Sequence, residues 1–121
     1  MTIQELNSKY NFHDSCITKI EYDSTHKSLS IYMDFCNWAQ SWYKESDSEL
    51  LRVKLSFEGI DDYNNIKGEI DYFSIGNAEI KDGKYFLFIE DDFNSKYYEL
   101  FLTPTSATFE ILGEVDENNE N

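Results

Sequence analysis

The chain has 121 residues, enough for one domain with a single core, and its ten Lys and Arg against twenty-four Asp and Glu give a formal net charge of −14. This surface repels phosphate, and a single arginine, Arg52, with scattered lysines does not supply the clustered cations that nucleic-acid binding requires. The charge also disfavours anionic membranes, and the longest apolar run, residues 85–89, is too short to span a bilayer. We therefore expect neither nucleic acid nor a membrane as a partner.

The N-terminal residues Met1–Leu6 have no basic start followed by an apolar stretch, so we expect no secretory signal and a cytoplasmic location. Because 17% of the residues are aromatic and 40% hydrophobic, the chain has enough apolar surface to fold. We assign residues 1–113 to one β-rich domain. Residues 114–121 hold four acids and three asparagines around one valine, which predicts an acidic, disordered tail.

The first half predicts one short helix and three strands. Thr2 can cap a helix over Thr2–Lys9. A polar cluster separates the apolar pattern of Cys16–Tyr22 from that of Leu29–Phe35, which is typical of a β-hairpin. Apolar and polar residues alternate along Leu29–Phe35 and again along Leu51–Glu58, so each of these segments is predicted to be a half-buried strand.

The register of the hairpin follows from placing its apolar residues on one face. The predicted pairs are Tyr22 with Leu29, Ile20 with Ile31, Thr18 with Met33, and Cys16 with Phe35. A shift by one residue would bring Cys16 opposite Cys36, but it would also turn the apolar set of one strand to solvent. We therefore predict that the two cysteines are not bonded to each other and that Cys16 faces the core.

Four more strands and a weak helix are expected in the second half. The strands are Tyr72–Ile80 broken at Gly76, Lys84–Glu90 after an Asp82-Gly83 turn, Lys96–Thr103 ended by Pro104, and Ala107–Gly113. The weak helix is expected within Asp61–Ile70. Lys84–Glu90 is apolar on both faces, which predicts the central and most covered strand.

These elements predict a mainly β fold, a mostly antiparallel meander that forms an open barrel or a sandwich with one short N-terminal helix. An exposed edge strand could pair two copies into a homodimer.

One grouping resembles a metal or thiol site: His13, Asp14 and Cys16, with His26 and Cys36 further along. It lacks the paired spacing of a zinc site, and the predicted hairpin turns Cys16 to the core and leaves His26 in an exposed turn. We interpret Asp14 or Ser15 as an acceptor of backbone N–H groups where the helix gives way to the first strand, with metal binding and catalysis as alternatives.

Other catalytic patterns carry little information. Adjacent carboxylates at Asp61-Asp62, Glu90-Asp91 and Asp91-Asp92 are too common in an acidic chain to identify an acid and a base. The sequence has no glycine-rich phosphate-binding motif and no nucleophile elbow. We therefore predict a non-enzymatic protein with no catalytic residues, no metal and no cofactor.

Acidic residues and aromatic residues occur together in three predicted loops. The candidate partner-binding residues are Trp38, Trp42, Tyr43, Glu45, Asp47, Glu49, Asp61, Asp62, Tyr63, Asp91 and Asp92. Tryptophan and tyrosine anchor protein interfaces, and clustered acids attract a basic protein over long range. Alternatively, the tryptophans close one end of the fold and the acids keep the protein in solution.

Short motifs point to a family resemblance over residues 12–60. They are Phe12-His13-Asp14-Ser15-Cys16-Ile17 with Ile20, then Leu29-Ser30-Ile31, then Phe57-Glu58-Gly59-Ile60. This pattern is similar to small bacterial β-rich immunity proteins of polymorphic and contact-dependent toxin systems. The resemblance implies a protein that binds a cognate toxin domain, often a basic nuclease, and covers its active site; it transfers no catalytic residue. The alternatives are an accessory β domain that binds a protein or small ligand, and an enzyme that uses His13, Asp14 and Cys16.

Overall fold

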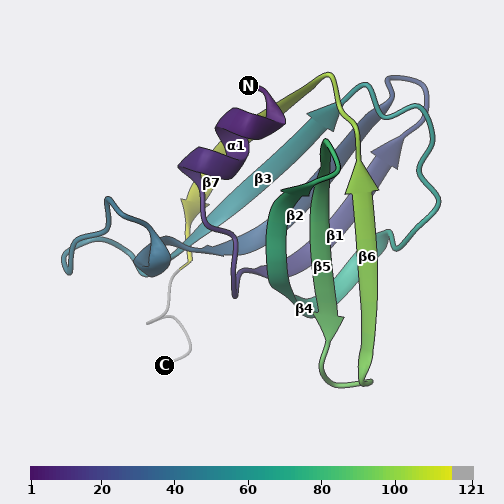
Figure 1. Cartoon of the computed structure of the whole chain (residues 1–121). Coiled ribbons are helices and arrows are strands. Elements are labelled where there is room, and N and C mark those ends of the chain that lie inside the picture. Colours follow the sequence, from purple (N-terminus) through teal and green to yellow (C-terminus); the bar gives the residue numbers. More distant parts are fainter. Residues whose placement is uncertain (116–121) are drawn as a thin grey trace.

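The computed structural model describes residues 1–115 (Figure 1). The elements in chain order are α1 (Ile3–Lys9), β1 (Cys16–Asp23), β2 (Ser28–Cys36), the 3-10 helix η1 (Asn37–Ala39), β3 (Leu50–Glu58), β4 (Gly68–Lys81), β5 (Lys84–Asp91), β6 (Lys96–Leu102) and β7 (Ser106–Glu114). Two residues of the predicted tail belong to the end of the sheet: Glu114 ends β7, and the N–H of Val115 donates to the carbonyl of Leu50 at 3.3 Å. The remaining tail residues, 116–121, lie outside the described residues.

The seven strands form one antiparallel sheet in the order β6-β5-β4-β1-β2-β3-β7, and the sheet is not closed. The predicted mainly β, antiparallel fold with one short N-terminal helix is confirmed. The prediction that Lys84–Glu90 forms the central strand is wrong, because β1 occupies the middle and β5 lies next to the edge strand β6. Pairing of β4 with β1 places β4, β5 and β6 on the opposite side of β1 from β2 and β3, whereas the last strand, β7, pairs with β3.

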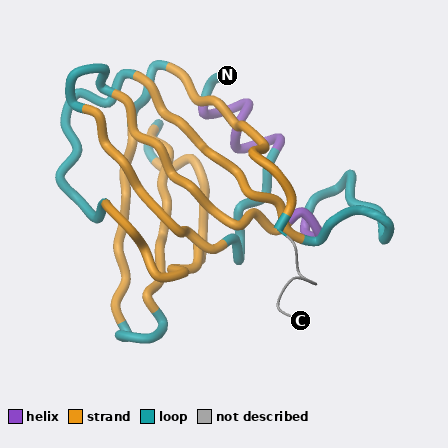
Figure 2. The backbone as a smooth tube through the Cα atoms, turned by 180° about the vertical axis from the view of Figure 1, so that it is seen from behind, coloured by secondary structure: helices purple, strands orange, loops and turns teal. Residues whose placement is uncertain are grey.

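The sheet bends strongly, so that its two halves enclose the core (Figures 1 and 2). Phe57 of β3 and Tyr85 of β5 are separated by three strands in the sheet order, yet their ring centroids lie 5.7 Å apart. The residues that alternate along β2 and β3 toward this concave side are buried, which confirms both half-buried strands. α1 contacts β4 and β7 and thereby covers part of the open side of the sheet.

Helix α1 begins as its sequence predicts. The Thr2 Oγ1 accepts the N–H of Glu5 at 3.1 Å, and the Glu5 carboxylate accepts the N–H of Thr2 at 2.9 Å. This reciprocal capping box satisfies two backbone donors that the helix itself leaves unpaired. Ile3 and Leu6 lie on the same side of the helix and are buried in the core.

A β-bulge at Thr18 changes the predicted hairpin register. Tyr22 pairs with Leu29 and Ile20 with Ile31, as expected, but Ile17 pairs with Met33 and Cys16 with Asp34. Because one extra residue reverses the alternation, Ile17 is fully buried and the predicted core position of Cys16 is wrong; Cys16 is partly exposed. Both cysteines are free thiols.

The connection from β3 to β4 is a loop up to Lys67, and the helix predicted within Asp61–Ile70 is absent from it. Tyrosine hydroxyls hold this loop in place of helical hydrogen bonds. Tyr22 Oη donates to the carbonyl of Ile60 at 2.7 Å, and Tyr63 Oη donates to the carbonyl of Ile66 at 2.5 Å. β4 then begins at Gly68, four residues before the predicted strand.

Candidate protein-binding site

The segment between β2 and β3, residues 37–49, forms a loop that projects from one end of the sheet (Figure 1). We call it the 37–49 loop. Its two ends are held together, because the N–H of Trp38 donates to the carbonyl of Glu49 at 3.2 Å and Asn37 Nδ2 donates to the carbonyl of Ser48 at 2.9 Å. Turns at its tip add two bonds between Lys44 and Asp47, one of them from the Lys44 N–H to the Asp47 carboxylate at 3.0 Å. The loop is thus a structured element with its own hydrogen bonds.

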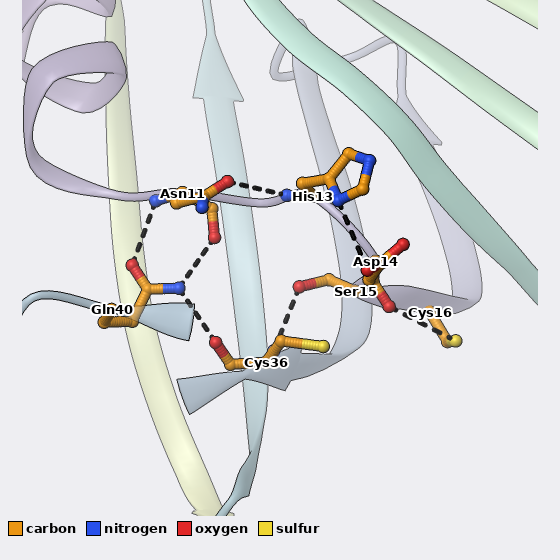
Figure 3. Close-up of polar contacts among 7 residues, drawn as sticks. All are labelled: Asn11, His13, Asp14, Ser15, Cys16, Cys36 and Gln40. Atoms are coloured by element: carbon orange, nitrogen blue, oxygen red, sulfur yellow. Dashed lines mark hydrogen bonds and ion pairs between the residues drawn. The ribbon is translucent and has the colours of Figure 1, made fainter. Parts of the chain in front are cut away.

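Gln40 ties this loop to the body of the protein (Figure 3). Its side chain is buried, and its amide oxygen accepts the N–H of Asn11 at 3.0 Å. Its amide nitrogen donates to the carbonyls of Asn11 at 2.7 Å and Cys36 at 2.8 Å. These three bonds satisfy backbone groups that would otherwise be buried without partners. A lone glutamine in a polar loop gives no signal of this role, so Gln40 is not among the predicted site residues.

The two tryptophans of the loop keep much of their surface exposed. Trp38 is 48% exposed and Trp42 is 42% exposed. Trp42 is nevertheless fixed, because its Nε1 donates to Asn37 Oδ1 at 3.0 Å and its ring meets the edge of Tyr10 at 5.8 Å. Tyr10 in turn stacks on Phe109 of β7 at 3.9 Å. A row of aromatic rings therefore connects the exposed tryptophan to the core.

The same loop carries three carboxylates. Glu45, Asp47 and Glu49 of the loop are exposed, as predicted. Glu114 at the end of β7 joins them, since its carboxylate accepts the hydroxyl of Ser48 at 2.5 Å. Glu114 falls within the predicted tail, yet it belongs to β7. The 37–49 loop therefore brings together six predicted residues, namely Trp38, Trp42, Tyr43, Glu45, Asp47 and Glu49.

The other predicted residues lie elsewhere. Asp61 and Asp62 are exposed on the connection between β3 and β4, where Asp61 pairs with Lys27 at 3.0 Å. Figure 1 shows this connection at the opposite end of the molecule from the 37–49 loop. Tyr63 was predicted as an interface aromatic, but it is buried against Tyr22 with ring centroids 5.7 Å apart. It belongs to the core.

The β5–β6 turn forms a third, separate group (Figure 1). Asp91 was predicted as an interface acid, but it is only 4% exposed, and its carboxylate accepts the N–H of Asn94 at 3.2 Å and its Nδ2 at 2.8 Å. Asp91 therefore holds the turn. Asp92 and Phe93 are exposed, the latter at 96%.

His13, Asp14 and Cys16 lie where the chain enters β1 (Figure 3). Ser15 is fully buried, and its hydroxyl accepts the N–H of Cys36 at 3.0 Å. The N–H of Asp14 donates to Ile75 of β4 at 2.9 Å. The His13 ring contacts the Asp14 carboxylate at 3.3 Å, with both side chains more than half exposed.

The surroundings of Cys16 disfavour its thiolate form. Burial raises the pKa of the Cys16 thiol, and the carboxylates of Asp34, Asp14 and Asp92 raise it further, which disfavours the thiolate. The second histidine, His26, lies in the β1–β2 turn against Asp23 at 2.7 Å. Within residues 1–115, no group of three or more His, Cys, Asp or Glu could hold a metal ion. Ser15 accepts a backbone N–H with its hydroxyl, as the interpretation of this segment expects, whereas Asp14 donates its own N–H and its carboxylate contacts His13.

None of the helices in residues 1–115 has the length and apolar character to cross a bilayer. Comparisons of the chain with protein-family models, curated proteins and solved structures found no match.

Proposed function

We propose that this chain is a non-enzymatic, acidic protein-binding domain of the immunity type, which inhibits a basic toxin domain in the bacterial cytoplasm by covering its active site. The observation that carries the proposal is the 37–49 loop, in which two exposed tryptophans stand among three exposed carboxylates on a hydrogen-bonded framework.

The framework matters because binding costs free energy when side chains must be ordered. Trp42 already has its indole N–H paired and one edge packed on Tyr10. An aromatic side chain that is fixed before binding buries its surface against a partner with little further loss of conformational entropy. The loop therefore supplies the desolvated centre that a tight inhibitor requires.

The charge supplies the complementary part. A net charge of −14 raises the association rate with a cationic partner and lowers it with an anionic one. A nuclease holds its substrate with cations that contact phosphate groups. Carboxylates of the 37–49 loop can meet those cations, so the inhibitor and the nucleic acid compete for the same groups.

Growth protection tests this function. The chain is co-expressed with the toxin domain encoded next to its gene, and we expect growth to be restored. A double variant with Glu45→Lys and Glu49→Lys should lose protection, since it reverses two exposed charges that bond to nothing else in residues 1–115. The matched control, Asp61→Lys with Asp62→Lys, makes the same change in net charge at the opposite end of the protein and should protect as the native chain does.

Three results decide the matter. Loss of protection in the first variant alone supports the 37–49 loop as the binding site. Equal loss in both variants shows that only overall charge matters and contradicts the site. A native chain that protects against no basic toxin domain refutes the function. Circular dichroism melting of each variant separates loss of binding from loss of the fold.

A further inference from the structure

The two edges of the open sheet differ in how they are covered. β6 forms one edge, and Asn65 of the β3–β4 connection lies across its middle, where Nδ2 donates to the carbonyl of Glu99 at 3.2 Å. β7 forms the other edge, and within residues 1–115 its outward backbone groups are bonded only at its start. There the N–H and carbonyl of Ala107 bond to the carbonyl and amine of Met1, at 2.7 and 2.8 Å.

The bonds of Ala107 identify which backbone groups of β7 face outward. In an antiparallel ladder, alternate residues direct both their N–H and their C=O to the same side. Since Ala107 points away from β3 and the register is unbroken as far as Ile111, Phe109 and Ile111 point away as well. Within residues 1–115, no group bonds to the outward N–H or C=O of these two residues. Among the described residues, β7 from Phe109 to Ile111 is therefore a free edge.

The side chains on this edge are unusual for an exposed strand. Ile111 is 58% exposed and Leu112 is 50% exposed. Glu110, between Phe109 and Ile111 in the sequence, points to the other face of the sheet and pairs with Lys54 of β3. In the described part of the chain, no strand lies on its other side, because β7 is the last strand of the sheet. Natural proteins protect free edges with lysine, proline, a β-bulge or a covering segment. Within residues 1–115, β7 from Phe109 to Ile111 has no lysine, proline or covering segment, and its bulge lies beyond Ile111, where Gly113 pairs with Arg52.

We propose that the free edge of β7, from Phe109 to Ile111, accepts an extended segment of the basic partner as an added antiparallel strand. This inference rests on the proposed function and names how the partner is bound. β7 ends at Glu114, which contacts Ser48 of the 37–49 loop, so the added strand would lead directly to the exposed tryptophans. Main-chain bonds give such a complex its affinity, and alternate side chains give it specificity.

The chemistry of the added strand follows from the faces of β7. A residue opposite Ile111 or Phe109 meets an apolar side chain, whereas a residue opposite Glu110 meets a carboxylate. The segment therefore alternates apolar residues with lysine or arginine. A second copy of this chain is the weaker occupant, because an antiparallel pair that matched Phe109 with Ile111 would place Glu110 opposite its own copy and bring together two chains of net charge −14.

The test uses a model basic strand, the capped peptide Lys-Val-Lys-Val-Lys-Val-Lys, with fluorescence anisotropy at low salt. Valines opposite Phe109 and Ile111 would exchange main-chain bonds with them, whereas the lysine N–H groups would point away. N-methylation of the valines should therefore weaken binding by about tenfold or more, the loss expected for one or two hydrogen bonds. N-methylation of alternate lysines should leave the affinity close to that of the parent peptide.

A protein variant gives the complementary measurement. Ile111→Pro removes an outward N–H that β3 does not use, so it should abolish the preference for the parent peptide while the sheet stays folded. Ile111→Val keeps the N–H and should bind as the native chain does. If Ile111→Pro fails to fold, the methylated peptides with the native chain still decide the question.

Several outcomes would overturn the proposal: no binding of the parent peptide, equal binding of all three peptides, or a native dimer that Ile111→Pro converts to a monomer. Growth protection by a native chain that fails the peptide test would leave the proposed function standing and remove only this binding mode. Peptide binding without growth protection would refute the function and keep the edge as a site for basic strands.

Discussion

The ring of Tyr85 lies against that of Phe57, 5.7 Å between centroids, although three strands separate their own strands in the sheet. This contact places a phenol inside the folded sheet, and Tyr85 Oη is buried without a hydrogen-bond partner among residues 1–115. An unpaired buried hydroxyl costs about 1–3 kcal/mol. Tyr85→Phe removes that hydroxyl and keeps the ring, so we expect unfolding to become less favourable by about 1 kcal/mol, measured by urea titration.

A second tyrosine provides the control for that experiment. Tyr22 Oη donates to the carbonyl of Ile60 at 2.7 Å, so Tyr22→Phe should destabilise the fold by about 1 kcal/mol. The two variants remove the same atom from the same residue type and should move the unfolding midpoint in opposite directions. A loss of stability in Tyr85→Phe comparable with that in Tyr22→Phe would contradict the buried, unpaired hydroxyl.

Stability should fall in alkaline solution. Burial raises the pKa of Tyr85 and of Tyr63 well above the usual value of about 10. Above pH 10 the unfolded chain therefore releases protons that the folded chain retains, so the folded state loses stability as the pH rises. Each such tyrosine contributes a slope of up to about 1.4 kcal/mol per pH unit.

The Tyr85→Phe variant isolates one of these contributions. Between about pH 9 and pH 11, its free energy of unfolding should decline less steeply than that of the native chain. Below about pH 9, the free energies of the two proteins should change in parallel with pH. Lysine deprotonation affects both proteins equally and cancels in the difference. Parallel declines across the whole range would show that Tyr85 is accessible to solvent.

Gln40 is expected to control the order of the 37–49 loop. Gln40→Leu keeps the approximate size but leaves three backbone groups of Asn11 and Cys36 unpaired, which should cost about 3 kcal/mol. Loss of these bonds frees the loop locally, so trypsin should cut faster after Lys44. Ser41→Ala, at the next position and exposed, should change neither stability nor cleavage. Unchanged cleavage in Gln40→Leu would mean that the loop is held by other contacts.

The thiol of Cys16 should react slowly. Because burial and neighbouring carboxylates raise its pKa, the thiolate fraction at pH 8 lies below that of an unperturbed cysteine. Alkylation by iodoacetamide, followed by mass spectrometry, should therefore lag behind that of a free thiol in a peptide. The double variant His13→Asn with Cys16→Ser should retain full growth protection. Rapid alkylation, or loss of protection in a variant that still folds, would revive a catalytic role.

Local patterns predicted the elements whose signals are local. The alternation in Leu29–Phe35 and Leu51–Glu58 located β2 and β3 to within one residue at each end, because each strand buries one face. The Asp82-Gly83 turn is as expected, with both residues at positive φ, 52° and 78°. A two-residue turn of this kind depends on nothing outside its own hairpin.

Long-range pairing was not predictable from these patterns. The contact of β4 with β1 and of β7 with β3 joins segments far apart in the chain, and neither pairing has a local signature. Both faces of Lys84–Glu90 are covered, although the strand is not central in the sheet. On one face, the cover comes from neighbouring side chains such as Phe101, which packs on Phe86. The bulge at Thr18 was missed because one inserted residue in a strand looks like ordinary loss of alternation.

The candidate site was predictable only where the exposure of a residue follows from its local sequence. The exposure of Trp38 and Trp42 follows from a loop that is longer than a hairpin needs and consists mostly of polar residues. In the sequence, Tyr63 and Asp91 stand beside residues much like those beside the exposed site residues. Only the tertiary fold buries these two side chains. The free edge of β7 could not be located before the strand order was known.

The position of β7 also bears on how the chain acquires its fold. β3 is complete by residue 58, but its outer neighbour is the last strand, residues 106–114. A nascent chain on the ribosome therefore exposes the bare flank of β3 until nearly all of the domain has emerged. Sheets built from such distant pairings form slowly, since loop closure precedes any gain in contacts. Folding of this domain is thus expected to be completed only when β7 docks against β3.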